Sequence, residues 1–139
     1  MKTGLLCIAL CFSIQCMIAQ DCTLSIGGKD KDIIVQVFQL NEEQITQLET
    51  WQAELAIKNK LIEEQLQLLL DEHPQSTQED LTNLAKKYKT KEQELVRISV
   101  GYDKKLLGIF NERQYQRYIE LCEEALRKPL KVVRPSSPE

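Results

Sequence analysis

The sequence predicts an all-α fold, built as a long antiparallel helical hairpin with short flanking helices. No Gly or Pro interrupts the 45 residues between Gly28 and Pro74, so long helices fit on both sides of Pro74. Apolar residues recur every seven positions in both stretches, which favours helices that cross at a shallow angle. A pattern typical of helix starts, Asn-x-x-Gln, also occurs twice, 70 residues apart.

Residues 1–19 have the composition of a signal peptide. Lys2 precedes an apolar stretch over residues 5–19, which is shorter than the roughly 20 residues of a transmembrane helix and is interrupted by Ser13 and Gln15. We therefore expect export, cleavage near Ala19, and no stable membrane insertion after cleavage. A retained membrane anchor is the alternative interpretation.

Cleavage would remove three of the five cysteines and leave Cys22 and Cys122 in a compartment that permits disulfides. Cys122 falls at an apolar position of an expected helix, which favours a buried free thiol. The alternatives are a disulfide between Cys22 and Cys122 and a disulfide between two subunits.

Local signals set the first elements of the mature chain. Residues 20–29 end in Gly27 and Gly28 and are expected to form a flexible lead. Segment 30–39 is rich in β-branched residues, but no partner strand is apparent, so we expect a short helix there. A helix is predicted from residue 42 to about residue 72, where His73 and Pro74 end it.

The second half of the chain is divided in the same way. Thr77 can cap a helix that we expect to run to about Ile109, with Gly108 near its end. A last helix is expected from residue 112 to about residue 127. The helical domain thus covers residues 30–128, and the prolines at 129, 135 and 138 predict a disordered tail over residues 129–139.

The two Asn-x-x-Gln motifs have matching apolar neighbours. An Asn at the N-cap with a Gln three residues later forms a capping box, and an apolar residue just before the cap packs on the first turn as a hydrophobic staple. We expect this structural role, with a direct role in binding as the alternative. The motif residues are Leu40, Asn41 and Gln44 in the first copy and Phe110, Asn111 and Gln114 in the second.

The long helices carry more apolar residues than one seam needs. The seven-residue spacing runs through Leu48, Leu55, Ile62 and Leu69, and through Leu81, Tyr88, Leu95, Tyr102 and Ile109. A second set of apolar residues lies off these seams, so we expect a binding partner to cover it. The partner is either a second copy of the chain or exposed apolar segments of other proteins. This set is Ala53, Ile57, Leu61, Leu68, Val96, Val100 and Leu107.

The mature chain is mildly acidic, with 17 Lys and Arg against 21 Asp and Glu once Lys2 is removed. A strongly basic domain is typical of nucleic-acid binding, so we expect no nucleic-acid partner. The charges are uneven, and the second long helix carries a cluster of basic residues that could form part of a binding face. These residues are Lys86, Lys87, Lys89, Lys91 and Arg97.

The residues of common active sites are almost absent. The chain has one His, no G-x-S-x-G sequence, no Gly-rich phosphate loop and no C-x-x-C pair. We therefore predict no enzyme activity, no cofactor and no metal site.

An exported helical protein with two such motifs resembles the LTXXQ-motif periplasmic family (Spy/CpxP-like). Asn replaces the family's Thr in both copies, which keeps the capping chemistry, and Phe110 replaces the second Leu. The resemblance covers roughly residues 30–127. It implies periplasmic localisation, a cradle-like homodimer, and either chaperoning of unfolded proteins or regulation of a stress sensor. Chaperone members are expected to have a basic concave face, whereas this chain is net acidic.

Two functions follow from these expectations. The first is an ATP-independent chaperone-like protein that binds unfolded or partly folded envelope proteins during envelope stress. The alternative is a regulatory adaptor that binds the periplasmic domain of an envelope-stress sensor. A metal-responsive variant is disfavoured because His73 is the single histidine and lies beside a proline in an expected turn.

Overall fold

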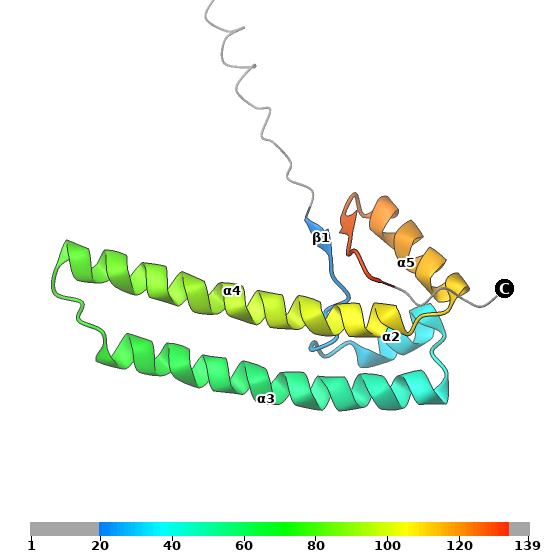
Figure 1. Cartoon of the computed structure of the whole chain (residues 1–139), viewed down its shortest axis with the longest axis horizontal. Coiled ribbons are helices and arrows are strands. Elements are labelled where there is room, and N and C mark those ends of the chain that lie inside the picture. The colour runs from blue at the N-terminus through cyan, green and yellow to red at the C-terminus, as the bar shows by residue number, and fades with distance from the viewer. Residues whose placement is uncertain (1–19, 134–139) are drawn as a thin grey trace, which may run out of the picture.

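The computed structural model describes residues 20–133, so the expected signal peptide and the last six residues lie outside the described part. Within residues 20–133 there are four helices and two short strands (Figure 1). The helices are α2 (Lys31–Phe38), α3 (Glu42–Glu72), α4 (Gln78–Gly108) and α5 (Glu112–Glu124). The strands β1 (Asp21–Cys22) and β2 (Lys128–Pro129) have two residues each. The predicted all-α class is confirmed.

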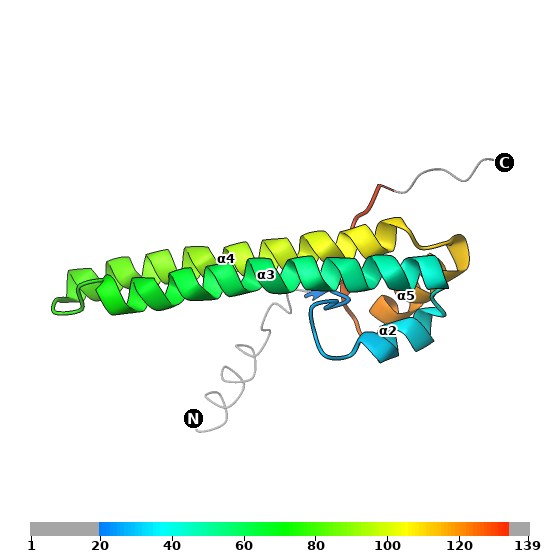
Figure 2. The same cartoon turned by 90° about the horizontal axis from the view of Figure 1, so that it is seen from below.

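Helices α3 and α4 lie side by side and run in opposite directions along the whole molecule (Figures 1 and 2). Each has 31 residues, which corresponds to about 46 Å at the usual rise per residue. The predicted bounds of both helices are confirmed to within about one residue. Thr77 caps α4 through a capping box with Asp80, and Gly108 is the last residue of that helix.

The buried side of α3 follows the predicted spacing, and that of α4 follows it only in part. Of the predicted α4 series, Tyr102 is buried, Tyr88, Leu95 and Ile109 are half-buried, and Leu81 is 45% exposed. Leu48, Leu55 and Ile62 are buried on α3, and Tyr102 and Leu106 are buried on α4. Leu107 does not lie on a free surface as the sequence predicted. It is fully buried, because the segment that follows α4 folds back and brings Phe110, Tyr118 and Leu130 into the same apolar cluster.

The main core lies at one end of the hairpin. There α2, α5 and the two strands pack against α3 and α4, whereas the far end, which carries the connection over residues 73–77, consists of the two long helices alone (Figures 1 and 2). The short helix predicted over residues 30–39 is confirmed as α2, with Ile34 and Phe38 buried. A hairpin covered at one end only leaves long helical surfaces exposed at the other.

The segment before α2 is ordered, in contrast to the flexible lead that the two glycines predicted. Ile26 is fully buried in the core. A Cβ atom at position 27 would lie 2.7 Å from Leu55 Cδ2, so Gly27 is needed for close packing against α3. Long-range contacts therefore order this segment, which local signals do not encode.

The chain after α5 is also packed as far as Val132, so the tail predicted from residue 129 is wrong for residues 129–132. Helix α5 ends at Glu124, and Leu126 follows in the left-handed conformation with φ 53°. The Arg127 N–H then donates to the Cys122 carbonyl, and the chain turns back towards the N-terminal segment. Strand β2 pairs in parallel with β1, and Leu130 is buried.

Candidate functional site

The two Asn-x-x-Gln motifs form identical helix starts. Oδ1 of Asn41 accepts the N–H of Gln44 at 2.9 Å, and Oδ1 of Asn111 accepts the N–H of Gln114 at 2.9 Å. In return, Oε1 of each glutamine accepts the N–H of its own asparagine, at 3.1 Å and 2.9 Å. Both capping boxes are therefore complete, one on α3 and one on α5.

The two glutamines also bind each other. Nε2 of Gln44 donates to Oε1 of Gln114 at 2.8 Å, and Nε2 of Gln114 donates to Oε1 of Gln44 at 2.9 Å. The second N–H of each amide reaches a backbone carbonyl beside the other motif, Ile109 at 2.8 Å and Gln39 at 3.4 Å. Both side chains are buried, and every amide hydrogen has an acceptor. The motifs thus join the starts of two helices that are 70 residues apart in the chain.

The apolar neighbours of the motifs are buried around this junction. Leu40 and Phe110 are both in the core, and the Phe110 ring lies 4.8 Å from the Phe38 ring, centroid to centroid. The residues that the sequence assigned to capping therefore also connect α2, α3 and α5. Nothing in local spacing predicts this contact, since it depends on how α5 docks against α3.

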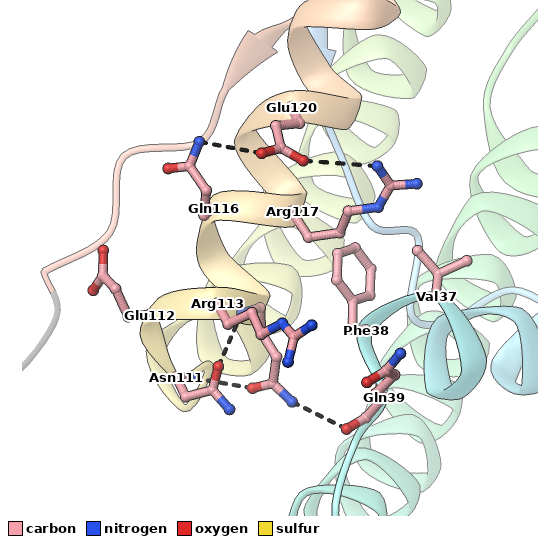
Figure 3. A pocket seen from close by; sticks show the side chains of 10 residues that line it. Val37, Phe38, Gln39, Asn111, Glu112, Arg113, Gln116, Arg117 and Glu120 are labelled. Carbon is pink, nitrogen blue, oxygen red and sulfur yellow. Dashed lines mark hydrogen bonds and ion pairs between the residues drawn. The ribbon is translucent and has the colours of Figure 1, made fainter.

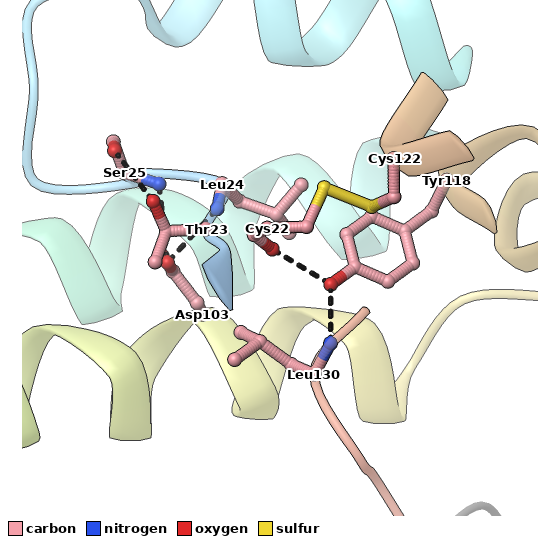
Figure 4. The surroundings of a disulfide bond; sticks show 8 residues. All are labelled: Cys22, Thr23, Leu24, Ser25, Asp103, Tyr118, Cys122 and Leu130. Carbon is pink, nitrogen blue, oxygen red and sulfur yellow. Dashed lines mark hydrogen bonds between the residues drawn. A yellow bond between two sulfur atoms is a disulfide. The ribbon is translucent and has the colours of Figure 1, made fainter. Parts of the chain in front are cut away.

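A buried carboxylate holds the N-terminal segment on α4. Asp103 accepts three backbone N–H groups, those of Leu24 at 2.9 Å and of Ser25 and Ile26 at 3.1 Å. Figure 4 shows the bonds from Leu24 and Ser25. Burial raises the pKa of Asp103 above its ordinary value, and the three hydrogen bonds oppose this shift only in part. Asp103 was not predicted as a site residue from the sequence, because its position on the buried side of α4 is the one feature that distinguishes it from other acidic residues.

Cys22 and Cys122 form a disulfide that joins β1 to α5 (Figure 4). The bridge replaces the buried free thiol that the sequence favoured for Cys122, because the ordered N-terminal segment brings Cys22 to this position. Beside it, the Tyr118 hydroxyl donates to the Cys22 carbonyl at 2.7 Å and accepts the Leu130 N–H at 2.8 Å. Burial raises the pKa of Tyr118, so this phenol stays protonated at neutral pH.

The candidate partner surface is only partly assembled. On α3, Ala53, Ile57, Leu61 and Leu68 are all exposed. At about 100° per residue they lie roughly half a turn away from the buried Leu48 and Leu55. We call Ile57, Leu61 and Leu68 the α3 strip. These three residues share one side of the helix, facing away from the core, with the exposed polar residues Glu64 and Gln65 between Leu61 and Leu68.

The residues on α4 do not join this strip. Val96 is 62% exposed, Val100 is half-buried against the core, and Leu107 is inside it. Most of the basic cluster (Lys86, Lys87, Lys89 and Arg97) is exposed, whereas Lys91 is half-buried and forms an ion pair with Glu94 at 2.9 Å. By helical spacing, Lys86 and Arg97 lie on the side of α4 opposite its buried residues. Val96 lies seven residues before the buried Asp103 and therefore on the same side of the helix as Asp103. The apolar strip and the basic residues therefore occupy opposite outer sides of the hairpin.

A cleft of about 740 Å³ lies between α2 and α5 (Figure 3). Val37 and Phe38 form its apolar floor, and Arg113 and Arg117 approach it from α5. A smaller, mostly apolar hollow of about 240 Å³ shares the same two floor residues and extends to Leu24, Ile33, Ile34, Tyr118 and Leu121. The cleft was not predicted from the sequence, although the spacing of Arg113 and Arg117 places both on one side of α5.

Two further features bear on the chemistry of the chain. Residues 20–133 contain no group of three or more His, Cys, Asp or Glu side chains placed to hold a metal ion. In the same part of the chain, no helix is both long and apolar enough to span a membrane.

Comparisons with protein-family models, curated proteins and solved structures found no match to this chain. The resemblance to the LTXXQ-motif family therefore depends on the two motifs.

Proposed function

We propose that this protein is an ATP-independent, chaperone-like protein of the periplasm, which binds unfolded or partly folded envelope proteins and forms a homodimer when no client is bound. The observation that carries the proposal is the α3 strip. Ile57, Leu61 and Leu68 are each more than half exposed on one side of a 31-residue helix. Apolar side chains that recur along one exposed helix side are a common feature of protein-binding surfaces.

The size of the strip suits reversible binding. Covering a large apolar side chain completely contributes roughly 1.5–3 kcal/mol, and these three side chains are already partly covered. Part of that free energy is lost in ordering the bound segment. Contacts of this strength would hold an unfolded chain briefly and release it without nucleotide.

The basic residues on the other outer side of the hairpin support a second kind of contact. Lys86, Lys87, Lys89 and Arg97 are exposed, so they attract acidic segments over roughly one Debye length, about 8–10 Å at ordinary salt. A client could be steered by charge and held by apolar contact. Higher salt should then weaken capture without abolishing it.

The direct test is suppression of aggregation. Two unrelated denatured proteins are diluted into buffer without ATP, with the mature chain from Gln20 added at increasing ratios, and light scattering is recorded. We expect suppression of both at near-stoichiometric ratios. The triple variant Ile57→Ser, Leu61→Ser and Leu68→Ser should lose most of this activity.

A matched control replaces apolar residues of equal or greater exposure elsewhere, Leu126→Ser and Val133→Ser, which are 82% and 96% exposed in the native chain. This variant should suppress aggregation like the native chain. If the native chain suppresses neither client, the chaperone proposal fails. The adaptor alternative then predicts that crosslinking in cells yields a single membrane protein with a periplasmic domain.

A further inference from the structure

The cleft between α2 and α5 has two chemically different walls. Its floor is apolar: Phe38 is held by the Phe110 ring, and Val37 beside it is 38% exposed. Its α5 side carries Arg113 and Arg117, which are four residues apart and therefore on the same side of the helix. Figure 3 shows both guanidinium groups beside the Phe38 ring.

The positive charge in the cleft is only partly balanced. Glu120 forms an ion pair with Arg117 at 3.7 Å, whereas Arg113 forms no ion pair within residues 20–133. Glu112 also lines the cleft but points away from the floor (Figure 3). One guanidinium group beside an apolar floor is thus available to a carboxylate, the partner that its planar geometry suits best.

The elements that carry the walls are tied to the rest of the fold before any ligand arrives. The glutamine pair joins the start of α5 to the start of α3, and the disulfide joins the end of α5 to β1. Helix α2 is fixed by the buried residues Ile34 and Phe38. A preformed site loses little conformational entropy on binding, so modest contacts suffice for measurable affinity.

We propose that this cleft binds the C-terminal end of a peptide whose last residue is large and apolar. The terminal carboxylate binds Arg113 and Arg117, and the last side chain packs on Val37 and Phe38. The carboxylate and the side chain of a C-terminal residue are attached to the same Cα atom. They therefore lie close together, as do the arginines and the apolar floor of the cleft. The next apolar residue of the peptide reaches the smaller hollow, which shares Val37 and Phe38 with the cleft.

The inference stands on the geometry of the cleft and is independent of the proposed chaperone activity. The α3 strip lies on an outer side of the hairpin, and none of its residues lines the cleft. A variant that empties the cleft of its charge should therefore still suppress aggregation. Either proposal can fail while the other stands.

The test measures fluorescence anisotropy of three labelled peptides with the folded, oxidised mature chain. The first is Gly-Ser-Gly-Ser-Ala-Leu-Phe with a free C-terminal carboxylate, and the second is the same peptide with a C-terminal amide. The third is the amide with Glu in place of Ala, which moves the carboxylate to an internal side chain. We expect the free acid to bind at least about tenfold more tightly than either amide.

Two variants locate the site. Arg113→Gln should weaken binding of the free acid by about tenfold, and Val37→Asp should weaken it by at least as much. Arg127→Gln removes the same charge from an arginine that does not line the cleft, and it should leave the affinity within about twofold. Circular dichroism checks that all three variants remain folded.

Three results would overturn the inference. Equal binding of the first two peptides would mean that the carboxylate is not recognised. Equal binding of the first and third would assign the cleft to internal acidic side chains and not to chain ends. Equal losses in Arg113→Gln and Arg127→Gln would mean that general charge attraction, and not the cleft, accounts for binding.

Discussion

The glutamines of the two motifs have a larger structural role than capping requires. A capping box needs one contact from Gln44 to Asn41 and one from Gln114 to Asn111. Each amide here makes further hydrogen bonds across the junction, including one to the carbonyl of Gln39 or Ile109. Because the site is buried, a side chain that could not donate would leave acceptors without partners, which typically costs about 1–3 kcal/mol.

Gln44→Glu tests this role with little change in shape. The carboxylate would face Oε1 of Gln114 and the Ile109 carbonyl without a proton to donate, so we expect the free energy of unfolding at pH 7 to fall by roughly 2–4 kcal/mol. Urea denaturation measures the loss. Gln65→Glu, on the exposed side of the same helix, should change stability by less than about 0.5 kcal/mol. Equal effects in the two variants would show that the junction contributes little.

Asp103 gives a prediction about pH. Its pKa in the folded chain is raised above 3.8 by burial, so the folded state retains a proton that the unfolded state has already released. The contribution of this group to stability therefore increases as pH falls from neutral towards 4 and decreases as pH rises through its folded pKa. Asp103→Asn removes the titratable group. It also replaces one of the two carboxylate oxygens that accept the three N–H groups.

The measurement is the difference in free energy of unfolding between the native chain and Asp103→Asn. We expect the native chain to be the more stable at each pH, with a difference that widens between pH 7 and pH 4. A difference that narrows on acidification would mean that the bonds from Leu24, Ser25 and Ile26 outweigh burial and hold the pKa of Asp103 below its ordinary value.

At the scale of elements, what could be predicted was local. The Asn41 and Thr77 caps and the Pro74 break fix the bounds of α3 and α4, because each acts on the first or last turn of its own helix. The flanking segments depend on distant partners. Ile26 is ordered by contacts to Asp103, 77 residues later, so two glycines beside it suggested flexibility that the fold does not have.

The candidate site also combines local features with features that depend on distant partners. Sequence spacing placed Ile57, Leu61 and Leu68 on one side of α3, because helical periodicity alone decides that. It placed Leu107 on a surface, because spacing along α4 alone does not show which of its residues the returning chain covers. The cleft could not be derived, since Val37 and Arg113 face each other only after α2 and α5 have docked.

The disulfide provides a test at the level of elements. Removing it in Cys22→Ser with Cys122→Ser should lower the free energy of unfolding by roughly 2–5 kcal/mol, because it closes a loop of about 100 residues. Hydrogen exchange should rise most at residues 22–26 and in α5. Hydrogen exchange could instead rise equally at the far end of α3 and α4, beside the connection over residues 73–77. The disulfide would then stabilise the whole fold and not the N-terminal segment alone.

At the scale of the whole molecule, the charges of the hairpin are unevenly distributed, and other elements pack against one of its ends only. From residue 42 to residue 80 there are 10 acidic and 2 basic residues, whereas residues 81–134 hold 13 basic and 7 acidic ones. One outer side of α3 is apolar and one outer side of α4 is basic, over an end of the molecule that no other element within residues 20–133 covers (Figure 2). A second copy that packs along α3 would cover the strip and leave the basic side of α4 in solution.

The last prediction is therefore a dimer that forms through the α3 strip and separates when the strip binds a client. Sedimentation velocity of the mature chain from about 1 to 100 µM should give a concentration-dependent shift from monomer to dimer, since contacts limited to a few apolar side chains give moderate affinity. Ile57→Ser, Leu61→Ser and Leu68→Ser together should keep the chain monomeric, and Leu126→Ser with Val133→Ser should not. A native chain that stays monomeric throughout would refute the dimer. If that monomer still suppressed aggregation, the strip would be free to bind clients directly, because no second copy would compete for it.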